Sequence, residues 1–299
     1  MAENYACLSV VDETSYCIPH ASRPAMSAPL MPASRKMAAL GPHHVETLNA
    51  HHLCTKTFIS ATIYHPTLAT EAHASIIIVS GFGCGEHSMA AWGPFYASHG
   101  IVAMTIGTPS PFKDQPDQRC QALLDAVEAL QAEHTRAGSL LEGRLDVDRC
   151  AVQGWSLGGG AALLAALNKP SLKCAIALAP HSGSDQRLWG QLTDVVPTLF
   201  LVGEKDSIAA PHTFAWPQYH KTAAPSLIFE IAGGDHFAAN GPSSGSTPPH
   251  VCWPCFICNF HNVIQSGCVP FPCITMNWPT GHATNSTTPG ASREGLPSG

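Results

Sequence analysis

Short apolar runs recur along the middle of the chain and predict the strands of a sheet. Each run is continuous and rich in aliphatic side chains, which is typical of strands buried on both faces. The runs cover residues 74–80, 101–106, 150–154, 174–178, 196–202 and 226–231. Longer stretches separate them, and from Gln118 to His134 the apolar residues recur at helical spacing. This alternation predicts an α/β fold with a doubly wound, mostly parallel sheet.

Composition and charge argue against some classes of function. The chain has 299 residues, of which 45% are hydrophobic and 12% charged, so it can bury one large core. Its net charge is −6, and the Lys and Arg residues are scattered, which argues against a nucleic-acid partner. No apolar run reaches the roughly 18 residues that a membrane span needs. We expect a monomer with no nucleic-acid partner and no membrane span.

The sequence around Ser156 carries the strongest chemical signal. Gly154-Trp-Ser-Leu-Gly158 follows one predicted strand and opens a run of small residues. A G-x-S-x-G motif in that position is typical of a nucleophile elbow, a sharp turn that lifts the serine oxygen above the sheet. Side chains at the two glycines would collide with the adjoining backbone. The motif predicts a serine hydrolase with Ser156 as its nucleophile.

Two later strands end at residues that can activate this serine. The run 196–202 leads to Asp206, and the run 226–231 leads to His236. Both then lie at the carboxyl ends of their strands, where ligands bind in open α/β sheets. Imidazole can take the serine proton, and a carboxylate can fix the imidazole tautomer. Glu204 and Asp235 stay open as alternative acids, because the sequence does not show which carboxylate faces the ring.

Six stretches also match one known family in register. They read Ala-Thr-Ile-Tyr-His-Pro-Thr at 61–67, Trp-Gly-Pro-Phe-Tyr-Ala-Ser-His-Gly-Ile-Val-Ala-Met-Thr-Ile at 92–106, Asp-Gln-Pro-Asp-Gln-Arg at 114–119, Gly-Trp-Ser-Leu-Gly-Gly-Gly at 154–160, Asp-Ser-Ile-Ala at 206–209 and Gly-Gly-Asp-His-Phe-Ala-Ala-Asn at 233–240. Residues 61–240 thus resemble the bacterial cutinase-like polyester hydrolases, which include poly(ethylene terephthalate) hydrolases. The resemblance implies an α/β-hydrolase fold, an open cleft without a lid, and a secreted enzyme.

The resemblance also implies a mechanism and a set of site residues. Polyester or short-chain acyl esters would be hydrolysed through an acyl-enzyme on Ser156, with Asp206 and His236 completing the triad and no cofactor or metal required. The oxyanion hole would be the backbone N–H groups of Phe82 and Leu157, where the family usually has tyrosine and methionine. The residues themselves agree, because such a hole uses the amide after the nucleophile and one from the loop after an early strand.

The cleft walls, by the same resemblance, include Trp155, His181 and Ile208. His181 follows Ala179 and Pro180, where the family has a tryptophan, so we expect weaker stacking on aromatic polymers. Alternative interpretations are a general esterase or lipase, a dienelactone-hydrolase-like enzyme, and a catalytically inactive remnant. The dienelactone hydrolases normally use a cysteine nucleophile, and Ser156 argues against that class.

The two ends fit this family less well than the middle. We divide the chain into an N-terminal extension at 1–58, a catalytic domain at 59–245 and a Cys- and Pro-rich tail at 246–299. Residues 1–40 lack the apolar stretch of a secretory signal peptide, although the resemblance implies secretion. No Asp, Glu, Lys or Arg occurs from Phe237 to Ser292, so the tail cannot supply the charged helix expected after the catalytic histidine.

The cysteines of the tail allow three interpretations. A metal cluster or a disulfide knot could form from Cys252, Cys255, Cys258, Cys268 and Cys273 with His250 and His261. C-x-x-C spacing alone is a weak metal signal, and no second pair follows at finger spacing. We favour a third interpretation, in which the reading frame was lost shortly after Asn240 and the tail is not an evolved sequence.

Overall fold

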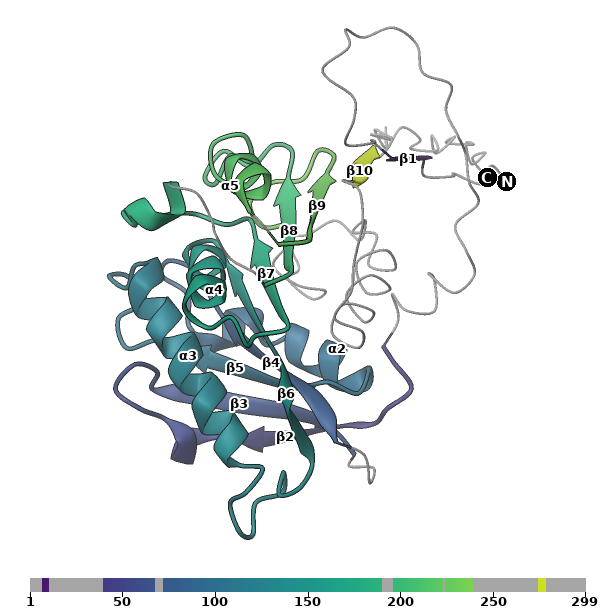
Figure 1. The fold of residues 1–299 in the computed structure, drawn as a ribbon, viewed down its shortest axis with the longest axis vertical. Coiled ribbons are helices and arrows are strands. Elements are labelled where there is room, and N and C mark those ends of the chain that lie inside the picture. The colour runs from purple at the N-terminus through teal and green to yellow at the C-terminus, as the bar shows by residue number, and fades with distance from the viewer. Residues whose placement is uncertain are drawn as a thin grey trace, which may run out of the picture.

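The strands form one open, ten-stranded sheet in the computed structural model (Figure 1). The structure describes residues 7–10, 40–67, 72–189, 196–222, 224–238 and 274–277. Along the sheet the strand order is β1-β10-β9-β8-β7-β6-β4-β5-β3-β2. The strands are β1 (Cys7–Val10), β2 (Val45–Asn49), β3 (Ser60–Pro66), β4 (His73–Val79), β5 (Val102–Gly107), β6 (Leu145–Trp155), β7 (Cys174–Leu178), β8 (Thr198–Gly203), β9 (Ser226–Ile231) and β10 (Ile274–Asn277).

The central strands confirm the predicted doubly wound, mostly parallel sheet. From β5 through β4, β6, β7, β8 and β9 to β10, every pair of neighbours is parallel. All six predicted strands are present, and β7 and β9 have the predicted bounds. The fold is that of an α/β hydrolase.

An antiparallel edge adds two strands that the apolar runs did not predict. β3 pairs antiparallel with β5, and β2 pairs antiparallel with β3. Buried and half-buried residues alternate along most of β3, and only two of the five residues of β2 are even half-buried. The sheet therefore includes residues that the sequence analysis assigned to the N-terminal extension.

Helices cover both faces of the sheet. α2 (Trp92–Ser98) packs on one face, and α3 (Pro116–Ala132) and α4 (Leu157–Asn168) pack side by side on the other (Figure 1). The predicted helix at 118–134 is α3. The shorter helices are α5 (Ala215–Lys221) and the 3-10 turns η1 (His51–Leu53), η2 (Glu86–Met89) and η3 (Gln186–Trp189).

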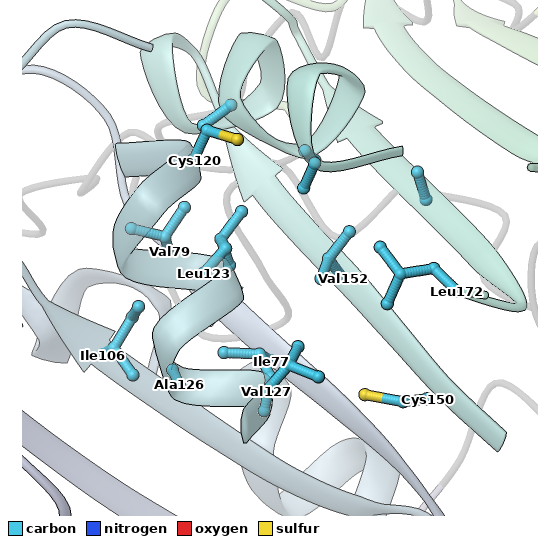
Figure 2. Packing of buried hydrophobic residues seen from close by; sticks show 14 of the residues in the cluster. Ile77, Val79, Ile106, Cys120, Leu123, Ala126, Val127, Cys150, Val152 and Leu172 are labelled. Carbon is cyan, nitrogen blue, oxygen red and sulfur yellow. The ribbon is translucent and has the colours of Figure 1, made fainter. Parts of the chain in front are cut away.

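Side chains of strand β4 pack into hydrophobic cores on both faces of the sheet. Ile76 and Ile78 pack in the core beside α2, whereas Ile77 and Val79 pack in the core beside α3 and α4. Successive side chains of a strand point to opposite faces, so a run of aliphatic residues is needed where both faces are covered. Figure 2 shows Ile77 and Val79 lying against Leu123 and neighbouring residues of α3. This double burial fixes the carboxyl end of β4, from which one side of the active site is built.

The ends of the chain are described only in part. Strand β10 falls within the segment 246–299, and it joins β9 to β1. Three predictions concern residues that the structure does not describe. They are the role of the tail cysteines and histidines, the loss of the reading frame after Asn240, and the absence of a charged helix after His236. Within the described residues, no group of three His, Cys, Asp or Glu could hold a metal ion. None of the helices described there is both long and apolar enough to cross a membrane.

A buried carboxylate fixes the end of α3. Glu133 follows the helix and is 1% exposed. Its two carboxylate oxygens accept hydrogen bonds from the Arg136 guanidinium at 2.6 and 2.7 Å, and the Ser139 hydroxyl donates a third at 2.7 Å. The Arg136 hydrogen bonds outweigh the effect of burial and lower the pKa of Glu133 to about 2. Because the folded-state pKa lies below the ordinary value of 4.5, this contribution to stability is complete above about pH 4.5 and is lost as the pH falls towards 2.

Glu133→Gln is therefore expected to lower the free energy of unfolding by about 2–3 kcal/mol at neutral pH, and by much less near pH 2. Urea unfolding of parent and variant at both pH values measures the difference. Glu128→Gln is the control, because Glu128 lies on α3 and is 72% exposed. Its ion pair with Lys169, at 3.9 Å, is at the surface, where such pairs contribute little to stability. Equal unfolding midpoints for the parent and Glu133→Gln at neutral pH would contradict the prediction.

Candidate active site

Ser156 lies at the sharp turn between β6 and α4, as the motif predicts. Its backbone has φ 58° and ψ −120°, a strained conformation for a residue with a side chain. A Cβ atom at Gly154 would lie 1.9 Å from the carbonyl oxygen of Gly158, and one at Gly158 would lie 2.7 Å from that of Val79. Both positions thus require glycine because backbone approaches backbone. The turn holds the Ser156 side chain at the carboxyl edge of the sheet.

The three predicted triad residues form a continuous hydrogen-bonded chain. The Oγ of Ser156 is 3.0 Å from Nε2 of His236, and Nδ1 of His236 is 2.7 Å from Oδ2 of Asp206. All three residues are buried, with exposed fractions of 4–5%. His236 is therefore placed to take a proton from the serine, with its far side held by a carboxylate.

The geometry separates Asp206 from the alternative acids. Oδ1 of Asp206 accepts the backbone N–H groups of Ile208 and Ala209, at 2.9 and 2.8 Å. Burial alone would raise its pKa, but the His236 hydrogen bond and these backbone donors bring the pKa below the ordinary value. Glu204 and Asp235 are exposed, and their carboxylates accept the backbone N–H groups of Gly233 and Phe237. Of the three candidate acids, Asp206 is the one whose carboxylate contacts the imidazole.

The two backbone amides predicted to form the oxyanion hole lie on elements next to Ser156. Leu157 is the first residue of α4, where the amide has no partner within the helix. Phe82 lies in the loop after β4, and among the described residues no hydrogen bond uses its N–H. A Cβ at Gly81 would lie 2.7 Å from the Cβ of Ser156, so this loop packs directly on the serine. The predicted oxyanion residues thus lie on the two elements that flank the serine.

A buried arginine supports the loop that carries Phe82. Arg119 of α3 is 0% exposed and donates to the carbonyl oxygens of Ser80 at 2.9 Å and Pro111 at 2.8 Å. Gly83 N–H donates to the same Pro111 oxygen at 2.8 Å. Burial lowers the pKa of Arg119. In the sequence, Arg119 stood out only as the last residue of the matching stretch 114–119; in the structure it holds the loop from beneath.

Exposed apolar side chains lie on the loops around the triad. Phe82 is 57% exposed, Phe112 68%, Ile208 55% and Phe237 41%. The rings of Phe82 and Phe112 meet edge to face with centroids 5.8 Å apart, and a Cβ at Gly83 would contact the Phe112 ring. Phe112 and Phe237 were not predicted from the sequence. These side chains give the site an open, apolar rim.

Trp155 differs from the wall that the resemblance implies. It is 4% exposed, and its indole N–H donates to the backbone oxygen of His236 at 2.9 Å. Its ring lies against His236 and Phe237, with centroid distances of 5.0 and 5.6 Å. The physical reason is that an indole with a satisfied N–H packs well in the interior. Trp155 thus supports the loop of His236 and offers little surface to a substrate, whereas His181 is half-buried.

Comparison with known proteins agrees with this geometry. Residues 20–259 match the family described as PETase, PET hydrolase-like. A cutinase from Thermobifida fusca (strain YX) is 35% identical over 83% of this chain and 80% of its own length. Cutinase 1 from Thermobifida cellulosilytica is 36% identical over 72% of this chain and 80% of its own length. A bis(hydroxyethyl) terephthalate hydrolase from Streptomyces coelicolor (strain ATCC BAA-471 / A3(2) / M145) is 31% identical over 78% of this chain and 73% of its own length.

The fold, the site and these relatives together define a class, a carboxylic ester hydrolase built on the α/β-hydrolase fold. Within that class, the chain belongs to the PET hydrolase-like family.

Proposed function

We propose that this protein is a serine ester hydrolase of the cutinase and polyesterase type, which works through an acyl-enzyme on Ser156. The observation that carries the proposal is the unbroken chain from Ser156 Oγ to His236 and on to Asp206. A serine hydroxyl becomes a competent nucleophile only when an adjacent base can take its proton. The amides of Phe82 and Leu157 supply the second requirement, donors for the negative oxygen of a tetrahedral intermediate.

The reaction follows from these positions. Oγ of Ser156 attacks the ester carbonyl carbon while Nε2 of His236 takes the hydroxyl proton. The carbonyl oxygen becomes an oxyanion facing the two amides. His236 then gives its proton to the alcohol oxygen as the ester bond breaks, which leaves the acyl group on Ser156. Water attacks this acyl-enzyme with His236 again as base, and the carboxylic acid and free Ser156 are restored.

The surroundings of the site favour an extended, apolar ester as substrate. Phe82, Phe112 and Ile208 offer apolar surface along an open rim, on which hydrocarbon or aromatic units can rest. The relatives are named as cutinases and a bis(hydroxyethyl) terephthalate hydrolase, in keeping with polyester or terephthalate esters. His181 supplies a smaller and more polar ring than the tryptophan of the resembling family. We therefore expect ready hydrolysis of short-chain esters and slower hydrolysis of aromatic polyester.

A panel of three substrates tests the proposal. The purified protein is assayed with p-nitrophenyl butyrate, emulsified triglyceride and a film of poly(ethylene terephthalate), with heat-inactivated protein as the blank. We expect fast release of p-nitrophenol and slow release of aromatic acid from the film. Fast hydrolysis of triglyceride with no attack on the film would instead favour a lipase. No hydrolysis of any ester would refute the proposed function and favour an inactive remnant.

The oligomeric state, the bounds of the catalytic domain and the localisation are also part of this proposal. We propose that the catalytic unit is a monomer, since the hydrogen-bonded triad is complete within one chain. We also propose that residues 59–245, together with strand β2, make up the catalytic domain, because β2 completes the edge beside β3. Secretion is proposed from the resemblance alone.

A further inference from the structure

A second histidine beside the triad is held in one protonation state by the backbone. The backbone N–H of His181 donates to the carbonyl oxygen of Ser156 at 2.9 Å, so this residue is held next to the nucleophile elbow. The N–H of Gly183 donates to Nδ1 of His181 at 2.9 Å. An acceptor nitrogen must carry a lone pair, so Nδ1 is unprotonated. The neutral ring then carries its single proton on Nε2.

The turn that makes this contact cannot easily rearrange. Gly183 has φ +53°, a left-handed conformation that favours glycine. Between the two residues, the buried Ser182 accepts a hydrogen bond from Nε2 of Gln218 at 2.9 Å. The ring of Phe214 covers one side of the imidazole, with centroids 4.3 Å apart. The imidazole is thus fixed in position as well as in tautomer.

The surroundings keep this imidazole neutral and leave its donor available. Burial lowers the pKa of His181, and the neighbouring His236 lowers it further. Protonation of Nδ1 would also place its N–H against the N–H of Gly183. Among the described residues, no group accepts a hydrogen bond from Nε2. A half-buried N–H without a protein partner, beside a catalytic serine, is suited to a substrate oxygen.

We propose that His181 is a specificity-determining residue whose Nε2–H donates a hydrogen bond to a second, non-reacting oxygen of the acyl group. This contact then favours esters whose acyl part carries a second carbonyl oxygen over esters of plain hydrocarbon acids. A site with a fixed donor discriminates against an analogue that cannot accept the hydrogen bond, because the donor is then left unpaired. The inference rests on the proposed ester-hydrolase function.

The test compares two substrates of equal size in the parent and in His181→Phe. The p-nitrophenyl esters of 4-acetylbenzoic and 4-isopropylbenzoic acid differ by a carbonyl oxygen in place of a methyl group. We expect His181→Phe to lower kcat/KM for the acetyl ester about fivefold more than for the isopropyl ester, mainly through KM. For each ester, the ratio of kcat/KM between parent and variant is used, because it cancels the different intrinsic reactivities of the two esters. His44→Phe is the control, since His44 precedes β2 at the opposite end of the sheet.

Further measurements keep the proposal open to refutation. His181→Gln retains an N–H donor and should recover part of the preference for the acetyl ester; it also decides the matter if His181→Phe does not fold. NMR of the imidazole nitrogens in the parent should place the proton on Nε2, and a proton on Nδ1 would overturn the proposal. Equal losses on both esters in His181→Phe would overturn it while leaving the ester-hydrolase function intact. A parent that hydrolyses neither these esters nor p-nitrophenyl butyrate would refute the proposed function, and this inference with it.

Discussion

Ser156→Ala is expected to lower the turnover of p-nitrophenyl butyrate by about 10⁴-fold or more. The variant loses the hydroxyl that contacts Nε2 of His236, so the base has no serine proton to take and no acyl-enzyme can form. The loss should fall on kcat, because the exposed rim that binds the substrate is unchanged. Steady-state kinetics of the purified variant measure the effect, with Ser171→Ala, an exposed serine before β7, as the matched control.

Covalent labelling tests the same assignment without a variant. A serine-directed p-nitrophenyl phosphonate should add one phosphonyl group to the parent protein, with loss of p-nitrophenolate, and peptide mass spectrometry should place it on Ser156. Ser156→Ala should take up no label. A variant that keeps a tenth of the parent activity, or a label on another serine, would show that Ser156 is not the nucleophile.

The sequence predicted those elements that a local run of aliphatic residues marks. Strands β7 and β9 are short aliphatic runs buried on one or both faces, and their bounds were predicted correctly. Strands β2 and β3 were missed because they form the antiparallel edge, where polar side chains interrupt the apolar pattern. The triad positions followed from chain order and strand ends, and the structure brings those three residues together.

The surroundings of the site could not be predicted in the same way, because they depend on contacts between distant parts of the chain. Arg119 contacts Ser80, 39 positions earlier, and no local pattern distinguishes it from a surface arginine. Trp155 donates to the backbone of His236, 81 positions later, which turns its ring inward. The donor geometry of His181 likewise requires the backbone of Gly183 in a left-handed conformation. These long-range contacts, which no local pattern reveals, distinguish the surroundings of the three side chains from what the sequence predicted.

Asp206→Asn is expected to lower kcat about 10³-fold or more, whereas Asp235→Asn should leave it within about threefold of the parent. Asparagine keeps the shape of the side chain but removes the charge that stabilises the protonated imidazole, and its amide can hold the ring in the wrong tautomer. Asp235 is an exposed residue next to the catalytic histidine, and its carboxylate caps the N–H of Phe237, so it is the matched control.

Both variants should be compared at equal concentrations of folded protein, because Asp206 also holds the amides of Ile208 and Ala209. One side-chain oxygen remains in asparagine to accept from those amides, so the melting temperature should fall much less than the activity. An Asp206→Asn variant that is as active as the parent would show that the contact with His236 is structural only. A severe loss in Asp235→Asn together with a harmless Asp206→Asn would move the acid to the residue beside the histidine.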